Sequence, residues 1–199
     1  MKIEQVEVLV LAAQEGKRDA LELLYHHFFT PMKRYALIRV HQTTTAEDLV
    51  QNVWLKVGRR LQFMQDVRVF RSWLYKALRW EIIDWARQQR NANFEELNES
   101  SLFIEDLRPE VLDVAPLLAG LKPNEREVIE LFYLSELSVN ETALVLSIAP
   151  GTVKSRLHSA REELRHRYLN EGDKPCQQRQ RGFQLGRPPV LRQHRNWIS

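Results

Sequence analysis

The sequence predicts an all-α protein of two small helical domains that an acidic linker joins. The 199 residues include only seven glycines, and long stretches without glycine or proline place apolar side chains at helical spacing. An acidic segment separates two such stretches, which predicts the division into domains. We expect an N-terminal domain over 1–90, a linker over 91–113, a C-terminal domain over 114–171 and a tail over 172–199.

Glycine, proline and capping residues set the expected helix ends in the N-terminal domain. Gly16 lies where the first helix should stop, and Pro31 is expected to open a new helix because proline suits the first helical turn. Thr45 and Asp48 have the spacing of a capping box, in which side chains satisfy the free amides of a helix start. The predicted helices are 3–14, 20–29, 31–40, 45–61 and 70–89.

The helix that begins near Thr45 has two different sides. The side expected to be buried carries Leu49, Val50, Val53, Trp54, Val57 and Leu61. The opposite side carries Asp48, Gln51, Asn52, Leu55 and Arg59. A polar stripe around an exposed leucine favours a protein-docking face, and a plain solvated face is the alternative.

The helix from Phe70 onward is apolar over more than half of its circumference, so that side is expected in the core. The remaining arc holds Ser72, Lys76, Arg79, Trp80, Ile83, Arg87 and Arg90. Cations beside an aromatic ring suit single-stranded nucleic acid, because cations follow the backbone while rings stack on bases. The alternative is that Trp80 and Ile83 pack on other helices and leave the arginines solvated.

A short loop, 62–68, joins these two helices and contains Phe63, Met64 and Asp66. Such a loop can hold an extruded base, or it can simply connect two helices. The residues alone leave both interpretations open.

Residues 137–157 predict two short helices joined by a tight turn, after helices expected at 114–118 and 124–135. Ser138 and Glu141 form a capping box for a helix over 139–146, and Pro150 opens the next helix. The inward side of that second helix holds Val153, Leu157, Ala160 and Leu164. Its outward side holds Thr152, Lys154, Ser155, Arg156, His158, Ser159 and Arg161. This geometry suits entry into a DNA major groove, and an ordinary helical hairpin with a solvated basic face is the plainer alternative.

The remaining composition favours a soluble, cytoplasmic protein. The net charge is only +3 although the sequence pI is about 9.1, so bulk basicity says little about nucleic acid. The single cysteine, Cys176, has no partner in the chain for a disulfide. No apolar run is long enough to span a membrane, and acidic residues interrupt the N-terminal apolar stretch, unlike a secretory signal. The tail is rich in Gly, Pro, Gln and Arg and is expected to be disordered.

Nothing in the sequence predicts catalysis. The six histidines lack metal-ligand spacing with cysteine or carboxylate residues. The chain has neither a glycine-rich phosphate loop nor a nucleophile elbow. We therefore expect no catalytic residue, no metal and no cofactor.

Three segments, in order, resemble the extracytoplasmic-function (ECF) sigma factors, the small two-domain specificity subunits of bacterial RNA polymerase. AEDLVQNVWLKV (46–57) is similar to the family's core-binding helix, and FRSWLYKALRWEIIDWARQQR (70–90) to its promoter-melting helix. LKPNEREVIELFYLSELSVNETALVLSIAPGTVKSRLHSAREELR (121–165) resembles the C-terminal domain of the family. The resemblance covers about residues 18–169.

This resemblance implies a sigma factor that directs RNA polymerase core enzyme to promoter DNA and that an anti-sigma factor controls. Its N-terminal domain would correspond to sigma region 2 and its C-terminal domain to region 4. The residues implied to bind polymerase are Asp48, Gln51, Asn52 and Leu55. Those implied to meet the minus-ten element as a separated strand are Phe63, Asp66, Lys76, Arg79, Trp80 and Arg87. Those implied to approach the minus-thirty-five duplex are Thr152, Lys154, Ser155, Arg156 and Ser159.

The chain departs from the family pattern at two positions. Trp80 stands where the family commonly has asparagine, so an indole that stacks on a base would replace an amide there. Ser147 replaces the usual glycine of the helix-turn-helix turn, which implies a strained or differently shaped turn.

A second hypothesis is a conventional helix-turn-helix regulator that binds operators without acting as a polymerase subunit. It predicts tight operator binding without polymerase and a symmetric dimer that matches a palindrome. The absence of a phosphate-accepting receiver pattern, and the basic aromatic stripe in the N-terminal domain, argue against this hypothesis.

Overall fold

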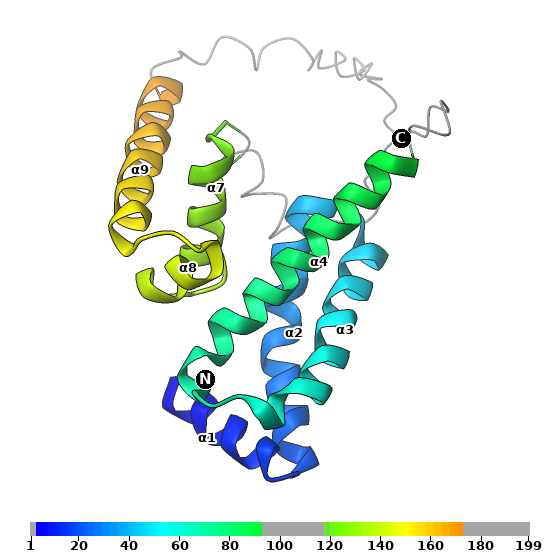
Figure 1. The fold of residues 1–199 in the computed structure, drawn as a ribbon. Helices are drawn as coiled ribbons and strands as arrows, with labels where there is room; N and C mark the ends of the chain where they lie inside the picture. Colours follow the sequence, from blue (N-terminus) through cyan, green and yellow to red (C-terminus); the bar gives the residue numbers. More distant parts are fainter. Residues whose placement is uncertain (1–2, 93–117, 119, 173–199) are drawn as a thin grey trace, which may run out of the picture. The chain divides into compact units, whose positions relative to one another are not determined.

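A computed structural model describes residues 3–92, 118 and 120–172, and every element in these ranges is helical (Figure 1). The predicted all-α fold is therefore confirmed. Residues 1–164 form one compact unit, and 165–199 form a second, of which the structure describes only the end of one helix. The predicted linker, the short helix expected at 114–118 and the tail lie almost entirely outside the described residues.

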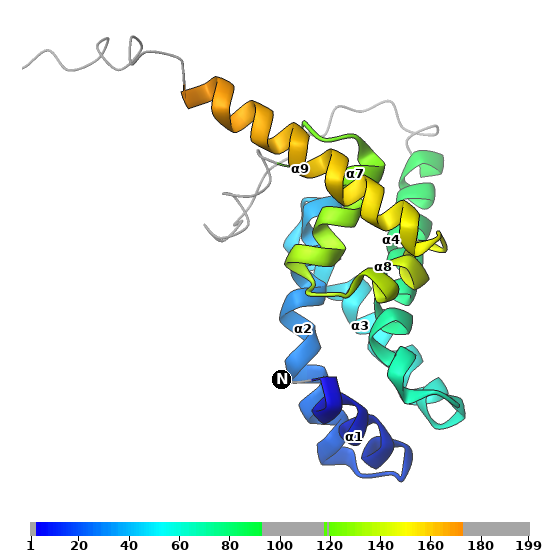
Figure 2. The same ribbon diagram turned by 90° about the vertical axis from the view of Figure 1, so that its left-hand side faces the viewer.

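Four long helices make up the N-terminal part of the compact unit (Figures 1 and 2). Two single 3-10 turns, η1 (Leu61–Phe63) and η2 (Val67–Val69), lie between the third and fourth helices. The four helices are α1 (Ile3–Gln14), α2 (Arg18–Val40), α3 (Thr43–Arg60) and α4 (Phe70–Ala92).

Pro31 lies inside α2, so the two helices predicted on either side of it are one, and that prediction was wrong. Proline in a helix interior costs about 3 kcal/mol relative to alanine. The helix nevertheless continues, because the buried stripe of α2 runs past this position: Leu24 and Phe28 precede it, and Met32 and Tyr35 follow. Burial of such side chains, worth about 1.5–3 kcal/mol each, outweighs the local penalty.

The capping box predicted at Thr45 was also wrong. Helix α3 begins at Thr43, so Thr45 lies within its first turn. The Thr45 hydroxyl donates a hydrogen bond to Oε1 of Gln42, the residue before the helix, at 2.5 Å. Asp48 consequently lies on the outer surface of α3 rather than at its start.

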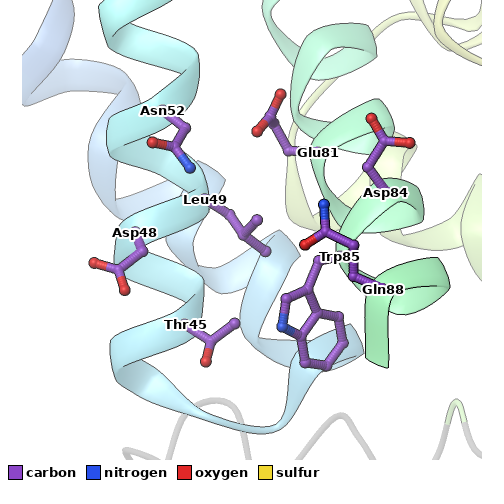
Figure 3. A pocket seen from close by; sticks show the side chains of 8 residues that line it. All are labelled: Thr45, Asp48, Leu49, Asn52, Glu81, Asp84, Trp85 and Gln88. Carbon is purple, nitrogen blue, oxygen red and sulfur yellow. The ribbon is translucent and has the colours of Figure 1, made fainter. Parts of the chain in front are cut away.

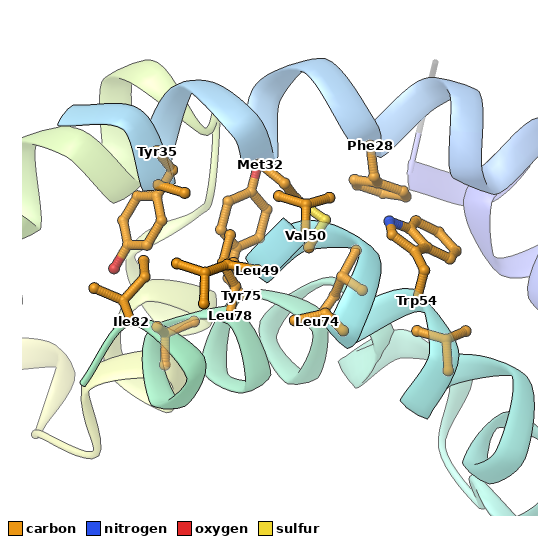
Figure 4. Packing of buried hydrophobic residues seen from close by; sticks show 14 of the residues in the cluster. Phe28, Met32, Tyr35, Leu49, Val50, Trp54, Leu74, Tyr75, Leu78 and Ile82 are labelled. Carbon is orange, nitrogen blue, oxygen red and sulfur yellow. The ribbon is translucent and has the colours of Figure 1, made fainter. Parts of the chain in front are cut away.

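The side predicted to be buried on α3 is buried, and it meets α2 and α4 in the main core (Figure 4). Phe28, Met32 and Tyr35 come from α2, and the rings of Tyr35 and Tyr75 meet edge to face at 5.7 Å. Burial raises the pKa of Tyr75 to about 12. Helix α3 contributes Leu49, Val50 and Trp54, and α4 contributes Leu74, Leu78 and Ile82.

The C-terminal part of the compact unit contains the predicted helix-turn-helix. Helix α7 (Pro123–Ile129) continues into a wider π-helical turn, η3 (Glu130–Leu134), where one α-helix was predicted. Helix α8 (Val139–Leu146) has the predicted bounds, and both bonds of the Ser138–Glu141 capping box are present. Helix α9 (Pro150–Gly172) begins at the predicted proline. Ser147 ends α8 in the left-handed conformation (φ 55°, ψ 45°), a conformation that usually favours glycine.

The helix-turn-helix has a smaller core of its own. As predicted, Val153, Leu157 and Ala160 of α9 face inward and are buried, and Leu164 packs against them. Three residues from the same part of the chain instead join the main core of α1–α4, namely Leu131, Leu137 and Val145. Helix α8 therefore contacts α4 within the compact unit.

Candidate partner and nucleic-acid interfaces

The outer side of α3 presents the four residues predicted to bind polymerase. Asp48, Gln51, Asn52 and Leu55 are all exposed, and Leu55 is 65% exposed. They are held outward because the opposite side of the same helix is fixed in the core. An exposed leucine among polar groups is suited to burial against a partner protein.

A shallow pocket of about 290 Å³ lies beside this surface, between α3 and α4 (Figure 3). Asp48 and Asn52 of α3 line it, together with Glu81, Asp84 and Trp85 of α4. Glu81 also pairs with Lys56, and Asp84 accepts a hydrogen bond from Arg87 Nη2 at 3.1 Å. The three carboxylates make this pocket a favourable place for a cationic side chain of a partner.

The loop between α3 and α4 has an ordered acidic turn and an exposed ring. Asp66 caps η2 by accepting a hydrogen bond from the Arg68 backbone amide at 3.0 Å. The Arg68 guanidinium also donates to both carboxylate oxygens of Asp66, at 2.9 and 3.0 Å, and these bonds lower the pKa of Asp66. Phe63 is 74% exposed, so its ring is free to stack on a planar group.

The predicted basic stripe of α4 divides into an exposed part and an engaged part. Trp80 is 55% exposed, and Arg87 and Arg90 are exposed too. Ser72 is not on the surface as predicted: it is buried, and its hydroxyl donates to the Val69 carbonyl at 2.9 Å. Ile83 is half-buried.

Lys76 and Arg79, the other cations of the stripe, bond to the C-terminal part of the compact unit. Lys76 Nζ donates to the Ser147 hydroxyl at 3.0 Å. Arg79 Nε donates to Glu127 Oε1 at 2.8 Å. A neighbouring arginine, Arg71, donates to the Glu136 carbonyl at 2.8 Å and lies 3.3 Å from Glu141 Oε1.

Sequence reasoning missed the most buried charge in this region. Glu130 is buried, and its carboxylate pairs with Arg39 of α2. Burial raises the pKa of Glu130, and the Arg39 charge partly opposes that shift. The one available signal was a carboxylate within the apolar run VIELF (128–132), because an acid among core residues needs a cationic partner.

The N-terminal half of α9 presents the residues predicted to approach duplex DNA. Lys154, Ser155 and Ser159 are exposed, and Thr152 and Arg156 are half-buried. Two of the hydroxyls are already bonded: Ser155 donates to the Thr152 carbonyl at 3.0 Å, and Ser159 donates to Glu125 Oε1 at 2.7 Å. Lys154 and Arg156 are the two cations of this set. The start of α9 lies beside them, and the free amides of a helix start favour binding of a phosphate group.

The described residues contain neither a candidate metal site nor a candidate membrane-spanning helix. Within the described ranges, no group of three or more His, Cys, Asp and Glu side chains is placed to hold a metal ion. None of the helices that the structure describes is both long enough and apolar enough to cross a membrane.

Two family models match the chain, in the same order as the helices described above. Sigma-70 region 2 matches residues 24–92, and sigma-70 region 4 matches residues 113–164. The first match includes the outer side of α3 and the stripe of α4, and the second includes the helix-turn-helix.

Curated relatives match over most of the chain. The ECF RNA polymerase sigma factor SigL of Mycobacterium tuberculosis is 32% identical over 164 residues, which covers 78% of this chain and 93% of SigL. BldN of Streptomyces coelicolor, another ECF RNA polymerase sigma factor, is 33% identical over 76% of this chain and 61% of BldN. The RNA polymerase sigma factor YlaC of Bacillus subtilis is 28% identical over 74% of this chain and 91% of YlaC.

Solved structures share the fold. CnrH, solved in complex with the cytosolic domain of CnrY, is 25% identical with a TM-score of 0.64, over 85% of this chain and 99% of that one. The sigma factor RpoE of Bartonella quintana, solved with the anti-sigma factor NepR, is 22% identical with a TM-score of 0.53, over 77% and 98%. The second likeness concerns the fold alone.

Proposed function

This chain belongs to the ECF sigma factors of the sigma-70 family, and from that membership we propose how its surfaces select a promoter. The chain would bind RNA polymerase core enzyme through one surface and promoter DNA through two others. The observation that carries this proposal is that both family regions match in order while buried cores leave most of their candidate contact residues exposed. The protein itself would carry out no bond chemistry, because the polymerase supplies the catalytic site.

The proposed polymerase contact is the outer side of α3, with Asp48, Gln51, Asn52 and Leu55. Leu55 would fill an apolar depression of the partner, and the acidic pocket beside it would receive a cationic side chain. The charges of Asp48, Glu81 and Asp84 would then orient the partner and raise the rate at which the two proteins associate.

The proposed minus-ten contacts are on α4 and on the loop before it. Lys76, Arg79 and Arg87 would follow the phosphates of the separated strand, and Trp80 would stack on a base. Phe63 and Asp66 would hold an extruded base, because an exposed ring offers stacking and a carboxylate accepts hydrogen bonds from base amines.

The proposed minus-thirty-five contacts are on the first turns of α9. Lys154 and Arg156 would bind phosphates or guanine edges in the major groove, and Thr152, Ser155 and Ser159 would bond to nearby oxygens. Polymerase would hold this helix in place, so the affinity of the isolated protein for duplex DNA need not be high.

Control by an anti-sigma factor completes the proposal. A protein that must bury both its polymerase and its DNA surfaces is silenced by any partner that covers those surfaces first. Binding to polymerase would place this chain in the cytoplasm, with no insertion of its own into a membrane.

Substitution of Leu55 tests the polymerase surface. Leu55→Ala should weaken binding to core RNA polymerase by about tenfold, because burying a leucine side chain is worth about 1.5–3 kcal/mol. Fluorescence anisotropy of the labelled protein, titrated with core enzyme, measures the affinity. Leu23→Ala is the matched control, since Leu23 is 56% exposed but lies on α2. Equal losses in the two variants would reject the α3 surface.

A further inference from the structure

The first helix, α1, is bonded to the loop that carries Phe63. Gln14 is the last residue of α1, and its side-chain Nε2 donates two hydrogen bonds. One goes to the Leu61 carbonyl at 2.9 Å and the other to the Met64 carbonyl at 2.7 Å. Leu61 precedes Phe63 in the chain and Met64 follows it, and the Phe63 ring is 74% exposed. The Gln14 amide therefore spans the turn from which this ring projects.

The chemistry of glutamine suits this place. The amide nitrogen of Gln14 carries two N–H donors and no charge, so it supplies one donor for each of the two carbonyls. A glutamate of the same length has acceptors only when it is ionised, and an asparagine is one methylene shorter. The two bonds thus depend on the identity of Gln14 and not merely on its bulk.

The turn that Gln14 spans, η1, is a weak element by itself. It is a single 3-10 turn closed by a hydrogen bond from the Met64 backbone amide to the Leu61 carbonyl at 3.0 Å. Bonds in a 3-10 turn have poorer geometry than those in an α-helix. Leu61 is buried and Met64 packs against the main core, so the side of the turn that faces inward is fixed by packing as well as by Gln14.

The end of α1 is fixed where Gln14 stands. The helix packs on α2 and contacts both turns of the loop, η1 and η2. It ends in a Schellman motif, in which the Gly16 amide donates to the Ala13 carbonyl at 3.0 Å and the Lys17 amide donates to the Ala12 carbonyl at 3.1 Å. Gly16 has the left-handed conformation that this motif requires, with a φ of 88°. Gln14 therefore reaches the loop from a well-anchored helix end.

The second half of the loop is also influenced by α1. The bonds to Asp66 raise the pKa of Arg68, and the negative charge of Glu7 on α1 raises it further. Helix α1 precedes residues 24–92, which the sigma-70 region 2 model matches, so this support for the loop comes from outside the matched residues.

We propose that Gln14 is a positioning residue for the minus-ten contact, which holds η1 so that Phe63 is already in place when a base is bound. The inference rests on the proposed function for the role of this loop in holding an extruded base. Gln14 itself does not touch the DNA. Its effect is to order the loop beforehand, so that less ordering entropy opposes binding of the strand.

Amide hydrogen exchange tests whether Gln14 holds the turn. Gln14→Met keeps the length and the helix propensity of the side chain and removes both donors. Exchange of the Met64 backbone amide, followed by NMR on the full-length chain, should become about tenfold faster in this variant because the turn opens more readily. Gln5→Met makes the same change at an exposed position of the same helix and should leave this exchange unchanged. Equal exchange in Gln14→Met and the unsubstituted chain would overturn the proposal.

Strand binding by the holoenzyme tests what the ordered turn does. The probe is a fluorescein-labelled single strand of about 20 nucleotides, taken from the minus-ten region of a promoter that the holoenzyme transcribes. With core polymerase, Gln14→Met should bind this strand about fivefold more weakly than the unsubstituted chain, and Gln5→Met should bind it equally well. The affinity of Gln14→Met for core polymerase should not change, which separates loss of the positioned turn from loss of folding.

A double substitution shows whether Gln14 acts through Phe63. Phe63→Ala should weaken strand binding by itself, and Gln14→Met should add little to that loss, because the turn then has no ring to present. Fully additive losses would overturn the positioning role. So would strand binding by Gln14→Met that equals that of Gln5→Met while Phe63→Ala weakens it.

The same variants distinguish this inference from the proposed function on which it rests. If the Met64 amide exchanges faster in Gln14→Met, but neither Gln14→Met nor Phe63→Ala weakens strand binding, then Gln14 holds the turn and the proposed role of the loop at the minus-ten element fails.

Discussion

At the scale of single residues, Glu141 shows how one side chain serves two levels of structure. Its Oε2 accepts a hydrogen bond from the Ser138 amide at 2.8 Å, which caps α8, while its Oε1 lies 3.3 Å from Arg71 on α4. The first bond was predictable, because it joins residues three apart in the sequence. The second was not, because the partners are seventy positions apart and no local pattern indicates which cation a carboxylate will meet.

The environment of His27 predicts how the stability of the folded protein depends on pH. Its pKa is lowered, first by burial and then by positive charge that includes Arg71, while Glu136 opposes the shift. The neutral ring is thus favoured in the folded protein, so the unfolded chain binds more protons once the pH falls below the ordinary histidine value of about 6.5. The stability that the neutral His27 ring contributes is fully present above that pH. It is lost as the pH falls through the lowered pKa of His27 in the folded state.

Urea unfolding at pH 7.5 and 5.5 measures this effect. The unsubstituted chain should lose stability relative to His27→Gln as the pH falls, and comparing the two chains cancels the opposite contribution of Glu130, whose pKa is raised. Free energies of unfolding that change in parallel with pH would contradict the role given to His27.

At the scale of elements, the predictable helices were those with local start and stop signals. The bounds of α1 and α8 follow from such signals, and so does the start of α9 at Pro150. Pro31 misled the prediction because core side chains carry α2 past the proline. Thr45 misled it because α3 begins earlier, at Thr43. A single sequence does not give the energy of contacts between distant helices.

The hydrogen bonds of the Ser138 cap predict how much a substitution at the start of α8 destabilises the protein. An eight-residue helix is too short to be stable by itself, so its end contacts matter more than in a long helix. Ser138→Ala should reduce the free energy of unfolding by about 1 kcal/mol, because the Glu141 amide loses its hydroxyl acceptor. Ser155→Ala, which removes an exposed hydroxyl from the interior of α9, should change it by less than about 0.5 kcal/mol. Guanidinium unfolding of both variants checks the difference, and equal effects would reject the cap.

At the scale of the whole molecule, the residues of some candidate surfaces could be predicted from the sequence, and the contacts of others could not. The exposed side of α3 and the outward side of α9 follow from helical periodicity, so their residues were predictable. The engagement of Lys76 and Arg79 by Ser147 and Glu127 depends on how the C-terminal helices pack on α4, which periodicity does not contain.

Promoter-dependent transcription is the most direct test of the proposed promoter selection. Core RNA polymerase with and without this protein would transcribe a library of genomic fragments, and the 5′ ends of the transcripts would be sequenced. We expect new start sites that appear only with the protein and share two upstream elements. Transcription from these sites should weaken with Leu55→Ala. Equal transcription with and without the protein, or start sites with no shared upstream sequence, would contradict this proposal.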